Sequence, residues 1–91
     1  MRYAVKRLEL TDLITLLREC AGEEEGVDLD GDILDVPFAE LGYDSLAVLQ
    51  TTGRIERDFD VLLDEEAVDE AETPRAYLEL INRALSERAG V

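Results

Sequence analysis

A six-residue stretch from Leu41 to Leu46, LGYDSL, holds the residues best suited to chemistry. In this stretch Ser45 stands at the predicted start of an amphipathic helix, directly after Asp44. A serine becomes a nucleophile when a neighbouring general base activates it. The chain has no histidine, and nothing in it resembles a Ser/His/Asp or Ser/Lys constellation around Ser45. We therefore expect Ser45 to be a point of covalent attachment, and we expect the chain not to be an enzyme.

The predicted start of this helix favours a phosphate group on the serine. The first backbone N–H groups of a helix are unpaired, and the helix dipole has its positive end there. A phosphodiester on Ser45 would therefore form where negative charge is already stabilised. Asp44 adds a carboxylate that can help to hold a metal ion during attachment. Gly42 permits the tight backbone entry that precedes the helix.

Apolar residues at helical spacing predict the elements that must position this stretch. Helices are expected at about residues 11–21, 45–59 and 74–87, with one short helix within 64–72. Residues 23–44 show no sustained period and predict a long loop. The fold class is therefore all-α, a small bundle of three longer helices and one short helix. The loop should be pinned by apolar anchors, for which the candidates are Ile33, Leu34, Val36, Phe38 and Leu41.

Individual residues give more local expectations. Thr11 is the expected N-cap of the first helix, and Thr73 followed by Pro74 marks the start of the last. Cys20 lies on the apolar side of the first helix, which predicts a buried structural thiol. Gly53 weakens a helix interior by about 1 kcal/mol relative to alanine. We therefore expect a close packing contact or a partner's approach at Gly53.

Size and charge limit the classes of function. The 91 residues predict one domain, 1–91, in which residues 1–10 are an N-terminal extension that could be flexible, lie along the bundle or contact a partner. The net charge of −14 would repel nucleic acid and anionic lipid, and it favours basic patches on partner proteins. Residues 1–7 are basic but lack the apolar run of a signal peptide, and no segment is long enough to span a bilayer. A cytoplasmic location and a monomeric state are the default expectations.

A metal site is not expected. The single cysteine and the absence of histidine exclude an ordinary zinc site. Asp28, Asp30 and Asp32 imitate the first ligands of a calcium-binding loop, but that loop requires glycine next and glutamate at its twelfth position. Ile33 and Ala39 occupy those positions. A solvated acidic loop is the favoured interpretation.

Residues Gly42 to Leu46 resemble the 4′-phosphopantetheine attachment site of acyl carrier proteins, with the pattern Gly-x-Asp-Ser-Leu at the start of the second helix. The resemblance extends from Leu13 to Leu85. The wording GYDSLA, the segment ECAG at residues 19–22 and the segments TPR and LINRAL of the last helix look like carriers of bacterial type II aromatic polyketide synthases.

This resemblance implies that Ser45 carries the phosphopantetheine arm and that Asp44, Gly42 and Leu46 support its attachment. It implies four kinds of partner: a phosphopantetheinyl transferase, a ketosynthase/chain-length-factor pair, a malonyl transferase, and ketoreductase or cyclase enzymes. Leu46, Leu49 and Glu56 are the expected docking residues, although Glu56 has the alternative of being a solvated charge. The chain departs from the family pattern at Gln50, Arg54, Arg57 and Asp64, and these departures argue against a direct transfer of the family's docking surface to this chain.

Arg75 and Asn82 are a further pair of candidates. They lie two turns apart in the last helix, and Asn82 falls beside the apolar positions Leu78, Ile81 and Leu85. One hypothesis is that the pair donates hydrogen bonds to a polyketone chain. The alternative is that Asn82 bonds loop backbone and Arg75 pairs with an acid.

Two other functions remain open from the sequence. The chain could carry fatty-acid, aminoacyl or other specialised acyl groups. It could also be an unmodified acidic interaction module, in which Asp44 and Ser45 only begin a helix.

Overall fold

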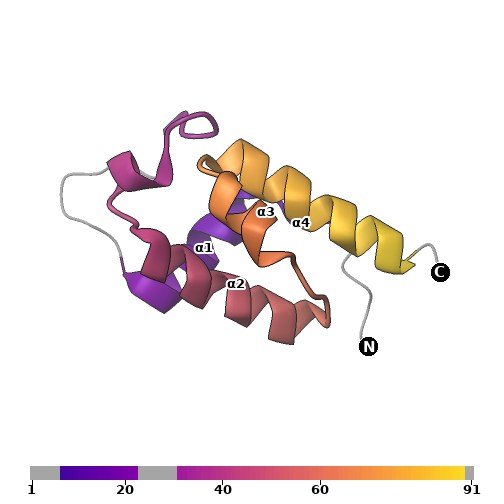
Figure 1. Cartoon of the computed structure of the whole chain (residues 1–91). Coiled ribbons are helices and arrows are strands. Elements are labelled where there is room, and N and C mark those ends of the chain that lie inside the picture. Colours follow the sequence, from indigo (N-terminus) through magenta and orange to yellow (C-terminus); the bar gives the residue numbers. More distant parts are fainter. Residues whose placement is uncertain (1–6, 23–30, 90–91) are drawn as a thin grey trace.

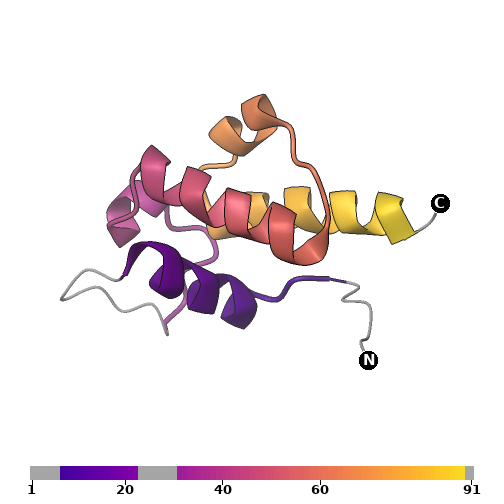
Figure 2. The same cartoon turned by 90° about the horizontal axis from the view of Figure 1, so that it is seen from below.

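The computed structural model describes residues 7–22 and 31–89, and within them it contains four α-helices and one short 3-10 helix. The helices are α1 (Leu10–Ala21), α2 (Ser45–Phe59), α3 (Glu65–Glu70) and α4 (Pro74–Ala89), and the 3-10 helix η1 spans Phe38–Leu41. The all-α class and the order of three longer helices and one short helix are confirmed. Seen from below, α1 and α3 lie on opposite sides of α2, with α4 behind (Figures 1 and 2).

Three helix starts follow the sequence signals closely. α2 spans the predicted residues, and the Asp44 carboxylate accepts a hydrogen bond from the Ala47 N–H at 2.9 Å. The Thr73 hydroxyl oxygen accepts one from the Ala76 N–H at 3.2 Å, and α4 begins at Pro74 as expected. Asp64, which departs from the family pattern, caps α3 through the Ala67 N–H at 3.3 Å.

The start of α1 and the long loop differ from expectation. Thr11 is not the N-cap: Glu9 occupies that position, and its N–H donates to the Asp12 carboxylate at 2.9 Å. The predicted loop also contains η1, whose four residues are too few to show a period. Among the expected loop anchors, Ile33, Phe38 and Leu41 are buried, whereas Leu34 and Val36 are partly buried.

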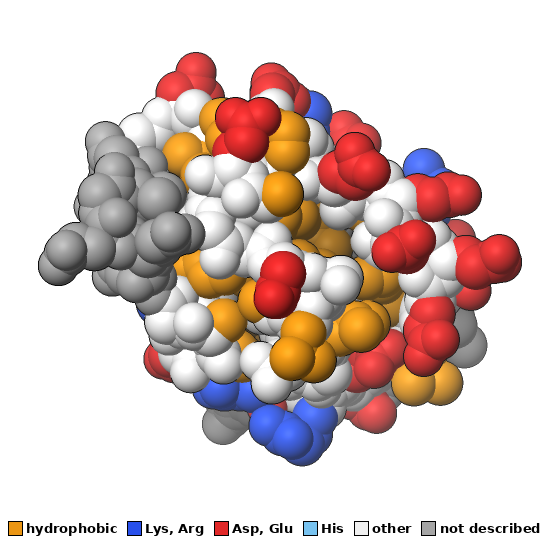
Figure 3. Space-filling model, turned by 60° about the vertical axis from the view of Figure 1, so that its left-hand side comes forward, with side chains coloured by type: hydrophobic (Ala, Val, Ile, Leu, Met, Phe, Trp, Pro, Cys, Tyr) orange, Lys and Arg blue, Asp and Glu red, His pale blue; other side chains and the backbone are white. Residues whose placement is uncertain are grey.

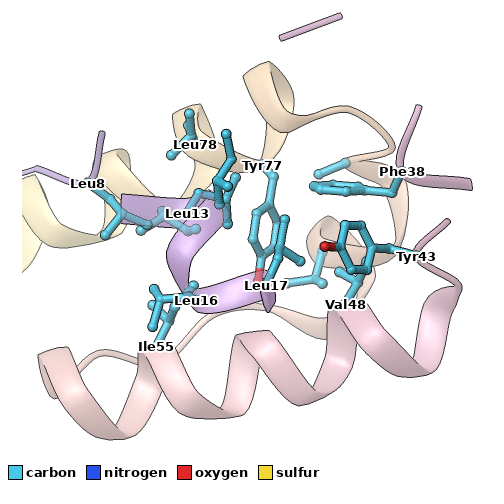
Figure 4. Packing of buried hydrophobic residues seen from close by; sticks show 14 of the residues in the cluster. Leu8, Leu13, Leu16, Leu17, Phe38, Tyr43, Val48, Ile55, Tyr77 and Leu78 are labelled. Carbon is cyan, nitrogen blue, oxygen red and sulfur yellow. The ribbon is translucent and has the colours of Figure 1, made fainter. Parts of the chain in front are cut away.

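The core lies where α1, α2, α4 and the second half of the loop meet (Figure 4). At its centre Tyr77 is fully buried, and its ring packs edge-on against Phe38 with centroids 5.5 Å apart. The Thr52 hydroxyl donates to the Val48 carbonyl at 2.7 Å, so the Tyr77 hydroxyl, 2.6 Å away, donates to Thr52. Both hydroxyl groups of this buried hydrogen-bond series, from Tyr77 through Thr52 to the Val48 carbonyl, therefore have a partner.

Burial of Tyr77 predicts a loss of stability in alkali. Burial raises the pKa of the Tyr77 phenol from 10.0 to about 12. The neutral buried phenol therefore makes its full contribution to the free energy of unfolding below pH 10. This contribution is lost as the pH rises through about 12, and its total is on the order of 2 to 3 kcal/mol. Urea unfolding at pH 9, 10 and 11 measures this dependence. The Tyr77→Phe variant should lack the part of the alkaline destabilisation that comes from Tyr77. An identical slope of unfolding free energy against pH in the two proteins would contradict the assignment of this loss to Tyr77.

The structure corrects two sequence expectations about single residues: burial of Cys20 and close packing at Gly53, while a partner's approach at Gly53 stays a prediction. Cys20 is only partly buried, because it lies near the C-terminal end of α1 at the edge of the apolar stripe. Gly53 is exposed, and a Cβ atom placed on it would meet no heavy atom within 4 Å, so no close packing within the described chain explains this glycine. Among the described residues, no helix is long and apolar enough to cross a membrane.

Candidate functional site

Ser45 is the first residue of α2, and its side chain is exposed to solvent. Two neighbours fix the approach of the backbone. Gly42 has a left-handed conformation with φ of 91°, which is easily adopted by glycine. The next residue, Tyr43, is buried, and its hydroxyl donates to the Gly22 carbonyl at the end of α1 at 2.8 Å. Ser45 is therefore an exposed residue on a firmly held turn.

The first turn of α2 retains capacity for an anion. The Ala47 N–H donates to the Asp44 carboxylate and the Val48 N–H to the Asp44 carbonyl, at 2.9 and 3.1 Å. The N–H groups of Ser45 and Leu46 precede these bonds and have no acceptor within the helix. An accessible hydroxyl beside two such donors fits a phosphodiester. Asp44, which was expected to support attachment, serves as the helix cap.

A cavity of about 370 Å³ opens beside Ser45, between η1, α2 and α3. Its inner wall is formed by the apolar residues Phe38, Tyr43, Val48, Val68 and Ala71. No local sequence signal marks this cavity, because its walls come from three elements. Phe38 was expected only as a loop anchor. Such a cavity has the size and polarity of a small-molecule site.

Main-chain and ionic contacts hold the loop that forms one wall of this cavity. The Phe38 N–H donates to the Glu72 carbonyl at 2.8 Å, and the Arg75 N–H donates to the Leu34 carbonyl at 2.9 Å. The Arg75 guanidinium also binds both oxygens of Asp35, at 2.7 and 3.1 Å. This hydrogen bond lowers the pKa of the Asp35 carboxyl and raises the pKa of Arg75. The pair is exposed, so it contributes little to stability by itself.

Asn82 binds the N-terminal segment. Its side-chain oxygen accepts the Leu8 N–H, and its amide donates to the Leu8 carbonyl at 3.0 Å. Leu8 is thereby held in the core with 1% of its surface exposed, so this residue of the N-terminal extension packs against the bundle and is not flexible, whereas residues 1–6 lie outside the described residues. These contacts of Asn82 and Arg75 agree with the alternative interpretation, in which the pair bonds backbone and an acid. Contact of Arg75 and Asn82 with an acyl chain stays a prediction.

Replacing Asn82 with leucine should lower the free energy of unfolding by about 1 to 3 kcal/mol, because the buried backbone groups of Leu8 would lose their partners. Equilibrium urea unfolding measures this change. Asn82→Asp keeps the acceptor but has no donor while its carboxylate is ionised, and protonation gives it an O–H donor, so this variant should retain more of the stability at low pH than at neutral pH. A stability equal to that of the native chain in Asn82→Leu would show that these bonds contribute nothing.

The expected docking residues lie in two environments. Leu46 and Leu49 are 61% and 50% exposed on the first turns of α2, close to Ser45. Glu56 is partly buried, and its carboxylate accepts the Leu63 N–H at 2.8 Å, so it holds the loop between α2 and α3. Arg54 binds Asp58 and Glu19 at 2.6 and 3.0 Å, and it thereby links α2 to α1. The alternative of Glu56 as a merely solvated charge is wrong.

Replacing Glu56 with alanine should destabilise the chain by about 1 to 2 kcal/mol, because the Leu63 N–H would lose its acceptor. The substitution should accelerate hydrogen exchange of the Leu63 amide more than exchange of the amides in α1. Glu66→Ala on the exposed face of α3 is the control with the same change of charge. Unchanged exchange at Leu63 in the Glu56 variant would show that the contact does not persist in solution.

Among the described residues, no group of three or more acidic or cysteine side chains is placed to hold a metal ion. Asp28 and Asp30 of the calcium-like pattern lie outside the described residues, and Asp32 is exposed.

Comparison with known proteins agrees with this geometry. Residues 15–81 match the family model described as a phosphopantetheine attachment site. The chain is 62% identical over 79 residues to the oxytetracycline polyketide synthase acyl carrier protein of Streptomyces rimosus, covering 87% of this chain and 83% of that protein. This chain belongs to the acyl carrier proteins of type II polyketide synthases.

Further relatives and solved structures agree with this assignment. The granaticin polyketide synthase acyl carrier protein of Streptomyces violaceoruber is 53% identical over 91% of this chain and 98% of its own length. The solution structure of the oxytetracycline acyl carrier protein superposes with a TM-score of 0.77, at 60% identity over 90% of this chain and 86% of that one. The solution structure of the 3,7-dioxo-octyl actinorhodin acyl carrier protein of Streptomyces coelicolor superposes with a TM-score of 0.82. Its sequence is 43% identical, and the match covers 91% of this chain and 96% of that one.

The family defines the role of this acyl carrier protein. It is a non-catalytic component of a polyketide synthase, and its cofactor is 4′-phosphopantetheine. The carrier role implies interaction with the enzymes of a synthase.

Proposed function

We propose that Ser45 carries the phosphopantetheine and that residues 1–91 form one carrier domain for growing polyketide chains. The observation that supports this best is the exposed Ser45 hydroxyl at the start of α2, beside two backbone donors and a cavity. Asp44 holds the helix start, Gly42 shapes the turn, and Leu46 adds an exposed apolar contact for the transferase. When bound, the cofactor supplies the thiol that holds the acyl group as a thioester.

The cavity beside Ser45 would shelter part of the acyl chain. Its inner wall is apolar and it opens next to the attachment point, so a chain can enter without a large rearrangement of the helices. Among solved relatives, the actinorhodin carrier has been described with 3,7-dioxo-octyl and octanoyl groups, and this chain superposes on the octanoyl form with a TM-score of 0.84. The proposal is that neutral acyl chains occupy the cavity beside Ser45.

Partner enzymes would meet the face that carries Ser45. Leu46 and Leu49 offer apolar contact there, and the net charge of −14 favours basic surfaces. The proposed partners are a phosphopantetheinyl transferase, a malonyl transferase, a ketosynthase/chain-length-factor pair, and ketoreductase or cyclase enzymes. A part for Glu56 in docking stays a prediction, since its carboxylate already binds Leu63. We also propose that the carrier acts in the cytoplasm as a monomer.

Reconstitution tests the proposal. The phosphopantetheine-bearing chain is loaded with malonyl groups and mixed with a type II polyketide ketosynthase/chain-length-factor pair, and the products are identified by mass spectrometry. We expect polyketones from the native chain, at least tenfold less from Leu49→Glu, and none from Ser45→Ala. Extension by fatty-acid enzymes but not by the polyketide pair would contradict a polyketide role. In that case attachment at Ser45 would still stand.

A further inference from the structure

We propose that the cavity beside Ser45 sorts acyl groups by charge, and that carboxylates at its rim keep negatively charged groups outside. Neutral chains would enter, whereas a malonyl group would stay in solvent. The inference rests on the proposed function, because it assumes that the cavity receives chains attached at Ser45.

The interior of the cavity disfavours a charged group. Phe38, Val48, Val68 and Ala71 are each buried and contribute apolar walls. Burying an ionised carboxylate against such walls is costly unless a hydrogen-bonding or cationic partner compensates it. The chain has nine Lys and Arg residues, yet none of those described lines this cavity. A carboxylate that entered would find no compensating cation among the lining residues.

The rim adds like-charge repulsion. Asp44, Glu65, Asp69 and Glu72 line the cavity, and all four are exposed. Glu65 and Asp69 are four residues apart in α3, so they project from the same side of that helix, towards the cavity. Figure 3 shows a hollow with hydrophobic side chains at its centre and acidic side chains around it. A chain end bearing negative charge would meet several negative charges before it reached the apolar wall.

This sorting has a functional consequence. A malonyl group ends in a carboxylate, so it would remain exposed on the flexible arm and available to the ketosynthase. A neutral chain would be partly sheltered from water between encounters. One cavity would thus keep the extender unit accessible and protect the growing chain, without any movement of the helices.

α3 offers a matched pair of variants for the test. Glu65→Gln/Asp69→Asn removes two charges from the rim. Glu66→Gln/Glu70→Gln removes two charges from the same helix at exposed positions that do not line the cavity. Each protein is loaded at Ser45 with an octanoyl group or with the same chain ending in a carboxylate, 7-carboxyheptanoyl. The readout is the change of the Val68 and Ala71 amide chemical shifts on loading, at low and moderate salt.

In the native chain and the control variant, we expect octanoyl to shift both amides and the carboxylate-ended chain to shift them at least threefold less. The ratio of the octanoyl-induced shift to the shift from the carboxylate-ended chain should fall by about half or more in the rim variant and at higher salt, because repulsion is removed or screened. Equal shifts from the two chains in the native protein would overturn charge sorting and leave the proposed function intact. A ratio unchanged by the rim variant would overturn the role of the rim, because the apolar walls alone would then exclude charge. If octanoyl shifts neither amide although attachment is complete, the cavity receives no chain, and both this inference and the sheltering role are lost.

Discussion

Replacing Tyr77 with alanine should lower the free energy of unfolding by about 3 to 5 kcal/mol, the largest effect on stability that we expect from one side chain. Tyr77 is fully buried, it packs edge-on against Phe38, and its hydroxyl binds Thr52 at 2.6 Å. Alanine would leave a cavity and remove both contacts. A domain of this size has a small margin of stability, so much of the population should be unfolded. Urea unfolding followed by circular dichroism measures the change.

Tyr77→Phe is the matched control for that experiment. It keeps the ring and removes only the hydroxyl, so we expect a loss of about 1 kcal/mol. Phe38 lines the cavity beside Ser45, and the Tyr77 ring supports it. The phenylalanine variant should therefore bind a neutral acyl chain as the native protein does. Losses of equal size in the two variants would show that the hydroxyl, and not ring packing, is the main contribution.

Replacing Ser45 with alanine should abolish attachment of phosphopantetheine and leave the fold unchanged. The exposed Ser45 side chain does not cap α2, because Asp44 does, and alanine is a better helix former than serine. We expect unfolding free energies within about 0.5 kcal/mol of the native value. Transfer of a fluorescent pantetheine group from a coenzyme A analogue, with urea unfolding of the same samples, measures both properties. Ser86, the only other serine, lies exposed on α4, and Ser86→Ala should retain full transfer.

The sequence predicts the elements near the site well because their signals are local. Asp44 and Ser45 begin α2, and Thr73 and Pro74 begin α4, where a capping side chain and a proline act within one turn. Thr11 failed as a cap because Glu9, two residues earlier, shares a bond with Asp12 instead. The observed end of a helix can differ from the predicted one by one or two residues when several polar side chains compete for the same backbone groups.

The parts that could not be predicted depend on contacts between distant residues. Asn82 binds Leu8, 74 positions away, and Arg75 binds Asp35, 40 positions away. Glu56 holds Leu63 because the chain reverses after α2, with Asp60 in a left-handed conformation. The cavity beside Ser45 is formed by three elements together. Helical spacing identified the buried faces of these elements, but it contains no information about which surfaces stay uncovered between them.

The most direct test of the central claim is the intact mass of the chain after incubation with coenzyme A, magnesium and a broad-specificity phosphopantetheinyl transferase, followed by peptide mapping. We expect a gain of one phosphopantetheine group in the native chain, located on the peptide that contains Ser45, and no gain in Ser45→Ala. An unchanged mass in a folded native chain, with the transferase active on another carrier, would contradict it. So would a gain that persists in Ser45→Ala.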